Sequence, residues 1–242
     1  MRGSTQESLL VFPQLKCFPW LSHGFTLRQN GIDVNVAREE VIERLQTKHQ
    51  KLLESQGIPW KYLQLGEQVH GNKVIVLHPK NTGVSVCSPQ TVHSDADGLV
   101  TAICDVPIGI YVADCCAVFL VETKQRAIGL LHSGRKGTEA NIVAEGIKQL
   151  KTVCGSQSAE ISAFLSPCIH GCCYDVDFVS EIELQLRAEG AGEIWQHPDC
   201  TGCHLDRYYS YRREKGCTGR MLAFMMIRPS DNLSQRPQRF EN

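Results

Sequence analysis

The sequence lacks an excess of charge of either sign. Its 242 residues contain 25 Lys and Arg against 26 Asp and Glu, so the formal net charge is -1. A protein that coats nucleic acid needs clustered positive charge to release counterions from the phosphates, so this balance argues against a nucleic-acid partner. The hydrophobic fraction of 42% and the charged fraction of 21% are typical of a folded globular protein.

Long hydrophobic runs are missing as well. The longest apolar run, residues 106–121, is interrupted by Asp114 and falls short of the roughly 20 apolar residues that a membrane-spanning helix needs. The first 15 residues contain one short apolar run, 9–12, and no basic start followed by a long apolar core, which a secretory signal would require. We therefore expect a cytoplasmic protein with no membrane partner and mostly reduced thiols.

Cysteine is the residue type that raises the functional question. The chain has 12 cysteines among its 242 residues. This is below the roughly 8–10% that marks a disulfide scaffold. In a reducing compartment, cysteines pack in the core, react or bind metals, so the question is which of these thiols take part in chemistry.

The apolar pattern predicts an α/β protein of the α+β type. Short runs rich in Val, Ile, Leu and Tyr predict strands at 62–65, 73–77, 98–102, 108–112, 117–122, 127–131, 160–165 and 221–227. Helical spacing predicts helices at 37–53, 137–153 and 178–188, with Thr138 capping the second. Strands that follow one another with few helices favour mixed sheets. We expect one domain over residues 1–242, with residues 229–242 as a frayed tail.

Three short motifs place a metal-ligand residue at the end of a predicted strand. They are Q-V-H-G at 68–71, A-D-C-C at 113–116 and L-H-S-G at 131–134. His70, Cys115 and His132 would form a catalytic zinc site, with three protein ligands and an open fourth position. By spacing alone the metal signal is weak, and the pattern favours the alternative that Cys115 packs in the core and the two histidines are loop residues.

These motifs resemble signature blocks of the YfiH family, also called the laccase-domain or multicopper polyphenol oxidase family, whose members are described as purine nucleoside phosphorylases. The matching blocks are Q-V-H-G at 68–71, D-G-L-V-T at 97–101, A-D-C at 113–115, H-S-G-R-K-G at 132–137, L-S-P-C-I-H-G-C-C-Y-D-V at 165–176, and Y-Y-S-Y-R-R at 208–213 followed by T-G-R-M at 218–221. The resemblance implies a single domain of mixed β-sheets flanked by helices. It also implies a catalytic zinc on His70, Cys115 and His132, with copper as a possible alternative.

The chain departs from the family pattern in places that border a pocket. The family's H-A-G-W-R-G block lacks its tryptophan here, and Lys136 replaces its arginine. Lys136 keeps the positive charge but not the planar fork that grips phosphate, which Arg135 could supply. An S-L-N-L-G segment is not recognisable after Arg28, and the segment 176–189 looks shortened. These departures concern the substrate more than the metal.

The family resemblance implies phosphorolysis of a purine nucleoside such as adenosine, inosine or methylthioadenosine, with possible deamination of adenosine. The partners would then be a purine nucleoside and phosphate; the sequence does not indicate an oligomeric state. The candidate residues are Arg135, Lys136, Arg212 and Arg213 for binding phosphate or ribose, Asp114 and Asp97 for proton transfer, and Gln68 and Cys172 as family-pattern positions without an assigned role. Asp114 could instead orient a zinc-bound histidine, and Asp97 could belong to a simple turn.

Other functions remain open for the same residues. Cys115 could be the thiolate of a cysteine hydrolase or amidase with His132 or His70 as its base, including an enzyme that edits cell-wall precursors. Copper oxidases use paired H-x-H motifs, which this chain lacks. A zinc-stabilised binding module would need His93 or Cys116 as a fourth ligand, but Cys116 should point away from Cys115 on a strand.

A second metal site is a further hypothesis for the cysteines. Seven of the 12 lie between residues 154 and 217. The segment from Cys200 to His204, C-T-G-C-H, resembles half of a zinc ribbon, and Cys168 with Cys172 or Cys173 could supply the other half. The alternative is a set of reduced, partly buried thiols.

Overall fold

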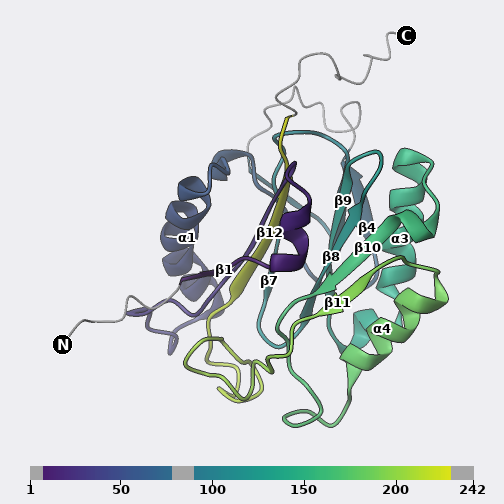
Figure 1. Cartoon of the computed structure of the whole chain (residues 1–242). Helices are drawn as coiled ribbons and strands as arrows, with labels where there is room; N and C mark the ends of the chain where they lie inside the picture. The colour runs from purple at the N-terminus through teal and green to yellow at the C-terminus, as the bar shows by residue number, and fades with distance from the viewer. Residues whose placement is uncertain (1–7, 78–89, 230–242) are drawn as a thin grey trace.

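The computed structural model describes residues 8–77 and 90–229, whose strands form two sheets between outer layers of helix (Figure 1). The helices are α1 (Arg38–Ser55), α2 (Arg135–Glu139), α3 (Ile142–Cys154) and α4 (Phe178–Ala188), with the 3-10 helices η1 (Pro13–Cys17), η2 (Trp60–Tyr62) and η3 (Ser158–Glu160). The strands are β1 (Leu9–Leu10), β2 (Leu21–Thr26), β3 (Gln64–Gly66), β4 (Val74–Leu77), β5 (Thr91–His93), β6 (Gly98–Thr101), β7 (Ile108–Val112), β8 (Cys116–Glu122), β9 (Ala127–Ser133), β10 (Ile161–Leu165), β11 (Ile194–Gln196) and β12 (Met221–Ile227).

Both sheets are mixed, as the strand pattern predicts. The first has the order β1-β2-β12-β7-β3-β5 and the second β11-β10-β8-β9-β6-β4. In the first sheet β12 pairs antiparallel with β2 and β7, whereas β3 runs parallel to β7 and β5. In the second, β8 lies antiparallel to β9 and β10, and the parallel pairs β4-β6 and β10-β11 form its two edges.

The alternation of side chains along the strands explains the layers. Phe119 and Val121 of β8 pack in the core between the sheets, which also contains Ile110 of β7. Val118 and Leu120 point to the other face of β8 and belong to the core that includes α3 and α4. The second sheet is therefore buried on both faces.

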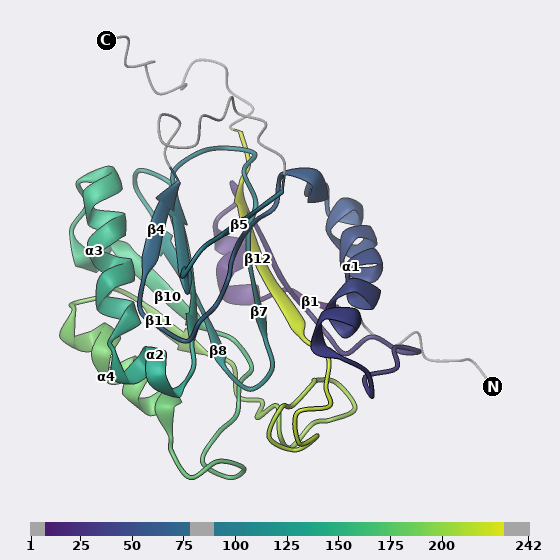
Figure 2. The same cartoon turned by 180° about the vertical axis from the view of Figure 1, so that it is seen from behind.

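Helix α1 covers the outer face of the first sheet. Leu53 near its end is buried with Leu222 and Phe224 of β12. The view from behind shows α1 on one side of the sheets and α3 and α4 on the other (Figure 2). The mixed α/β prediction is thus confirmed, with helices on both outer faces.

The predicted helix 137–153 is wrong in one respect, because the structure divides it. Asn141 adopts a left-handed backbone conformation, with φ of 53°, between α2 and α3. Its side chain accepts a hydrogen bond from the backbone N–H of Ala144 and caps α3. Thr138, the predicted cap, instead lies inside α2 and donates its hydroxyl to the Gly134 carbonyl. Strands β5 and β11 were not predicted, and of the predicted tail only residue 229 is among the described residues.

Candidate functional site

Turns from both sheets meet at the site. Gln68 and His70 follow β3 of the first sheet, Cys115 lies in the turn from β7 to β8, and His132 lies near the end of β9 in the second sheet. Gln68, His70 and Asp114 have positive φ values of 63°, 64° and 80°. Such values are uncommon for residues with a side chain, and they gather at sites where the surrounding structure holds the backbone for a function.

His70, Cys115 and His132 come together as a potential metal shell. Their ligand atoms all lie within 4.8 Å of one another, and the two imidazole ring centroids are 4.8 Å apart. Gly134 makes the approach possible, because a Cβ at this position would lie 2.6 Å from the Cys115 sulfur. Two imidazole nitrogens and one thiolate suit zinc, and three protein ligands are the set of a catalytic site with an open position.

Asp97 is fully buried and fixes the orientation of His132. Its Oδ1 lies 2.8 Å from His132 Nδ1 and also accepts the backbone N–H of His70, while Oδ2 accepts the N–H of Gly71. Burial opposes ionisation, but the hydrogen bonds from His132 and Gly71 outweigh it and lower the pKa of Asp97. With Nδ1 engaged, His132 has Nε2 available for a metal.

Cys115 and His132 ionise together in the absence of a metal. Burial alone would raise the pKa of Cys115, but the positive charge of His132 and hydrogen bonds from both histidines lower this pKa to about 6. Burial likewise opposes the charged form of His132, but the Cys115 thiolate and Asp97 raise the pKa of His132 to about 9. The thiolate form needed for metal binding is therefore favoured near neutral pH.

Asp114 occupies a different environment from Asp97. Its Oδ1 accepts the Thr201 hydroxyl at 2.7 Å, and its Oδ2 accepts the backbone N–H of Arg212 at 2.7 Å. Asp114 borders the cavity described below, whereas Asp97 is the carboxylate that contacts a histidine of the metal shell. From the sequence, Asp114 was considered as the carboxylate that orients a metal-bound histidine, but it is Asp97 that contacts His132.

A cavity of about 770 Å³ opens over the metal shell. This volume lies in the usual range for small-molecule sites, roughly 300–1,000 Å³. The cavity is lined by the three shell residues, by the cations Arg135, Arg212, Lys215 and Arg220, by the aromatic residues Tyr111, Tyr174, Phe178 and Tyr211, and by Gln68, Ala113, Asp114 and Ile169. The wall thus combines positive charge with aromatic surface.

The predicted cations separate into two groups. Arg135 and Arg212 line the cavity, and the Arg212 guanidinium lies 4.6 Å from the centroid of the Tyr174 ring. Lys136 and Arg213 are exposed and are not among the lining residues. Lys215 was not predicted from the sequence as a cation at the site, and Arg220 was named only as part of the T-G-R-M block. Gln68 has a structural contact, because its amide donates to the Tyr111 carbonyl and accepts the Tyr111 N–H.

The proposed fourth ligands lie elsewhere. Nε2 of His93 is 3.1 Å from Oε1 of Gln64, and Cys116 is buried in the core on the helix side of the second sheet. Neither belongs to the ligand group around Cys115 among residues 8–77 and 90–229. Cys172 joins a separate group of four cysteines.

The sequence model of the family described as "Multi-copper polyphenol oxidoreductase laccase" matches residues 22–181 and 175–228. The chain belongs to this laccase-domain, or YfiH, family. A protein named purine nucleoside phosphorylase from Staphylococcus epidermidis is 30% identical over 84% of this chain and 90% of its own length. Purine nucleoside phosphorylase YlmD of Bacillus subtilis is 25% identical over 87% of this chain and 83% of its own length.

Solved structures of the laccase-domain family share the fold. The Bacillus licheniformis protein YfiH superimposes with a TM-score of 0.80 at 20% identity, covering 91% of this chain and 97% of that one. YlmD of Geobacillus stearothermophilus gives a TM-score of 0.76 at 24% identity, over 88% and 93%. Among the described residues, no helix is long and apolar enough to span a bilayer.

Proposed function

We propose that this laccase-domain protein is a zinc-dependent purine nucleoside phosphorylase. The observation that carries the proposal is the His70, Cys115 and His132 group at a cavity of about 770 Å³ whose wall joins cations to aromatic rings. Relatives named purine nucleoside phosphorylases support the same activity. Adenosine, inosine and methylthioadenosine are the proposed substrates.

His70, Cys115 and His132 would hold the metal. When bound, zinc supplies a Lewis acid that polarises an oxygen ligand and offsets negative charge. The same donor atoms also accept copper, so the assignment of zinc is part of the proposal. Asp97 acts through His132 as a positioning residue, because it keeps the ring in one tautomer and one orientation.

The cavity wall contains groups that would bind each of the two substrates, phosphate and the nucleoside. In phosphorolysis a phosphate oxygen attacks C1′ of the ribose while the bond from C1′ to the purine nitrogen breaks. We assign the phosphate to Arg212 and Arg135, whose guanidinium groups can hold two oxygens at once. The purine would stack on Tyr174 or Tyr211, because aromatic side chains offer a flat apolar face.

Deamination of adenosine is the second reaction proposed for this cavity. It replaces the amino group at C6 with an oxygen from water, so a protein group must carry a proton from the water to the leaving ammonia. Asp114 is the carboxylate at the cavity wall and is assigned this role. Asp97 contacts His132 and is fully buried, so we assign it to positioning this histidine and not to proton transfer.

Product analysis tests the proposal. Zinc-loaded protein is incubated with adenosine, inosine or methylthioadenosine, with and without phosphate. We expect free purine base only with phosphate, inosine from adenosine in either buffer, and loss of both with Cys115→Ala. Cys217→Ser, which changes an exposed cysteine outside the metal shell, is the matched control. The proposal is wrong if neither free base nor inosine forms under any condition.

A cysteine hydrolase is the second candidate, because Cys115, His132 and Asp97 also form a nucleophile, base and orienting carboxylate. In that mechanism the thiolate attacks an amide carbonyl, the C–N bond breaks as His132 protonates the leaving amine, and water then hydrolyses the resulting thioester to release the acid and the thiolate. A chelator separates the two candidates. Activity that is lost on chelation and restored by zinc supports the phosphorylase, whereas amide hydrolysis that persists in metal-free protein supports the hydrolase.

A further inference from the structure

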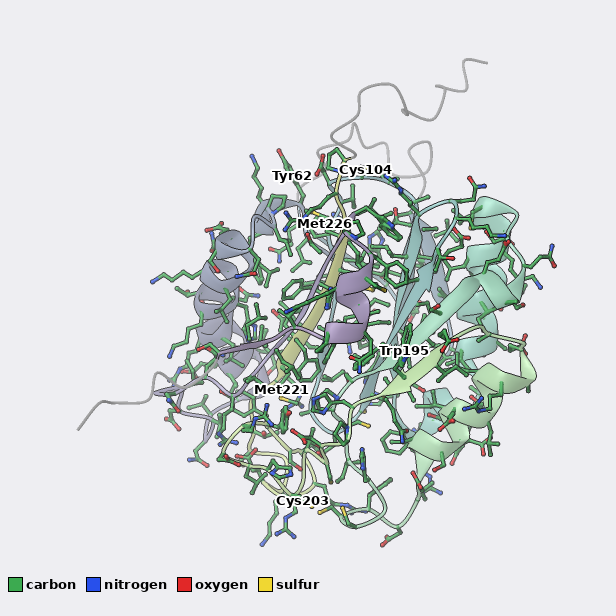
Figure 3. The ribbon with its side chains drawn as sticks, in the orientation of Figure 1. Tyr62, Cys104, Trp195, Cys203, Met221 and Met226 are labelled. Atoms are coloured by element: carbon green, nitrogen blue, oxygen red, sulfur yellow. The ribbon has the colours of Figure 1, made fainter. Side chains whose placement is uncertain are left out.

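Four cysteines converge at the lower end of the molecule, outside the residues that line the cavity. They are Cys172 and Cys173 in the turn before α4, and Cys200 and Cys203 in the segment between β11 and β12. Figure 3 places Cys203 among these lower loops, far from Met226 at the upper end of β12. The sulfur atoms all lie within 4.8 Å of one another.

The spacing of the sulfur atoms matches a tetrahedral metal shell. With a zinc-to-sulfur distance of about 2.3 Å, the edges of a tetrahedron of thiolates are about 3.8 Å long. The Cys203 sulfur lies 3.4 Å from that of Cys172 and 3.4 Å from that of Cys173. These distances are close to that edge, and Cys203 lies equally near two partners rather than paired with one.

The sulfur of Cys200 accepts a hydrogen bond from a backbone N–H group, as metal-bound thiolates do. The N–H of His170 donates to its sulfur at 3.3 Å. Donors around a thiolate orient it and stabilise its charge in metal sites.

Gly202 allows the two cysteine pairs to approach. A Cβ at this position would lie 2.8 Å from Cys173 Cβ and 3.0 Å from Cys173 Sγ. Any other residue between Cys200 and Cys203 at this point would push the two turns apart. The lack of a side chain at Gly202 therefore lets the four sulfur atoms lie close together.

From this geometry we propose that Cys172, Cys173, Cys200 and Cys203 bind a second zinc ion in a closed, structural site. The C-x-x-C segment supplies two ligands and the adjacent pair supplies the other two. Cys168, considered above as a ligand, is not among the four; it is buried and forms a bridge of backbone hydrogen bonds with Cys200. On binding, each thiol gives up its proton to solvent, and no change of oxidation state is involved.

The second site joins the two segments that build one wall of the cavity. Thr201, between two of the ligands, donates to Asp114, and Tyr174, next to Cys173, lies against the Arg212 guanidinium. A metal here fixes both segments relative to each other, as a closed zinc site does in small domains. The proposed role is to hold the cavity wall, separate from the chemistry at Cys115.

Zinc stoichiometry tests the site without relying on activity. Protein purified without chelator is examined by native mass spectrometry and by elemental analysis. We expect two zinc ions per wild-type chain, one in Cys203→Ser and one in Cys115→Ala. Cys217→Ser, an exposed cysteine in the same segment but outside the group, should keep both. Cobalt bound to Cys115→Ala should give the strong thiolate charge-transfer bands of a four-sulfur site.

The outcomes distinguish this site from the one at Cys115. One zinc that disappears in Cys115→Ala and persists in Cys203→Ser overturns the second site and leaves the proposed function intact. One zinc with the opposite dependence supports the second site and contradicts the catalytic metal. A wild-type mass that is lower by two hydrogens, with no zinc lost in Cys203→Ser, identifies a disulfide and overturns the proposal. If Cys203→Ser does not fold, the wild-type and Cys115→Ala counts still decide.

Discussion

Asp97 determines how His132 can meet a metal. Its carboxylate binds Nδ1 of the imidazole and also holds the backbone N–H groups of His70 and Gly71. One buried side chain therefore sets the ring orientation of one candidate ligand and the backbone position of another. Carboxylate partners of this kind fix the orientation of a metal-binding histidine and raise its basicity.

We predict that Asp97→Asn weakens zinc binding at Cys115 by about 10–100-fold, the usual effect of removing a carboxylate partner of a metal-bound histidine. Competition against a chelator of known affinity measures the change, with Cys203→Ser as the background so that one site is observed. Asp95→Asn is the control, because Asp95 is exposed and its φ of 57° is one that asparagine tolerates. Unchanged affinity in Asp97→Asn would show that His132 is oriented by other contacts.

The three candidate ligands could be predicted from the sequence, but the residues that contact them could not. The family motifs name His70, Cys115 and His132, and the structure places these side chains within reach of one metal. Asp97 was a candidate for proton transfer, with a simple turn as the alternative; its contact with His132 was not predicted, because that contact depends on the pairing of β6 with β9. Lys215 reaches the cavity from a loop with no local signal that its side chain would face the site.

Helix α3 packs against the second sheet through a glycine. A Cβ on Gly146 would lie 2.6 Å from a methyl group of Leu131 and 3.0 Å from one of Leu120. Glycine costs a helix roughly 1 kcal/mol relative to alanine, so its presence in mid-helix needs a packing reason. Here the reason is the close approach of α3 to β8 and β9.

We predict that Gly146→Val lowers the free energy of unfolding by about 1–3 kcal/mol, the usual cost of overfilling a packed core. Urea unfolding followed by circular dichroism measures the change. Lys151→Val on the exposed face of the same helix carries the helix propensity of valine without the contact and should change stability by less than about 1 kcal/mol. Equal effects of the two substitutions would contradict close packing at Gly146.

Elements with a clear apolar period were predictable, and those fixed by tertiary contacts were not. The predicted helix 178–188 and the strands 108–112 and 221–227 coincide with α4, β7 and β12. The break at Asn141 was missed because the apolar stripe continues through it, while its positive φ interrupts the helical backbone between α2 and α3. Strand β11 has three residues and is specified by its parallel pairing with β10, which no local pattern shows.

At the scale of the whole molecule, the layers depend on pairings between distant segments. Strand β12, the last strand among the described residues, lies between β2 and β7, and the parallel strand β3 extends the same sheet. The class of mixed sheets flanked by helices follows from the strand pattern and the family resemblance. The division into two sheets, and hence the meeting of their turns at the metal shell, does not follow from any segment alone.

The side chains of His23 and His49 are buried among these layers, and burial disfavours the protonated form of both. Burial lowers the pKa of His49, which lies in α1 and contacts Thr26 of β2, to about 3, and its Nδ1 has no hydrogen-bond partner within the described part of the chain. Burial also lowers the pKa of His23, in β2, to about 4, although a hydrogen bond to Phe12 partly compensates. Both side chains are therefore neutral in the folded protein near pH 5, whereas unfolding exposes groups with a pKa of about 6.5.

We predict that acidification destabilises the fold through these histidines. Their folded pKa values lie below the unfolded value, so their contribution is complete above about pH 6.5 and is lost as pH falls towards 4 for His23 and 3 for His49. Between pH 6.5 and 5 each should cost about 2 kcal/mol. Urea unfolding at both pH values should show a smaller loss for His49→Gln, by about this amount, and an unchanged loss for His204→Gln at an exposed position. A loss in His49→Gln equal to that of the wild type would mean that other groups take up the protons on unfolding.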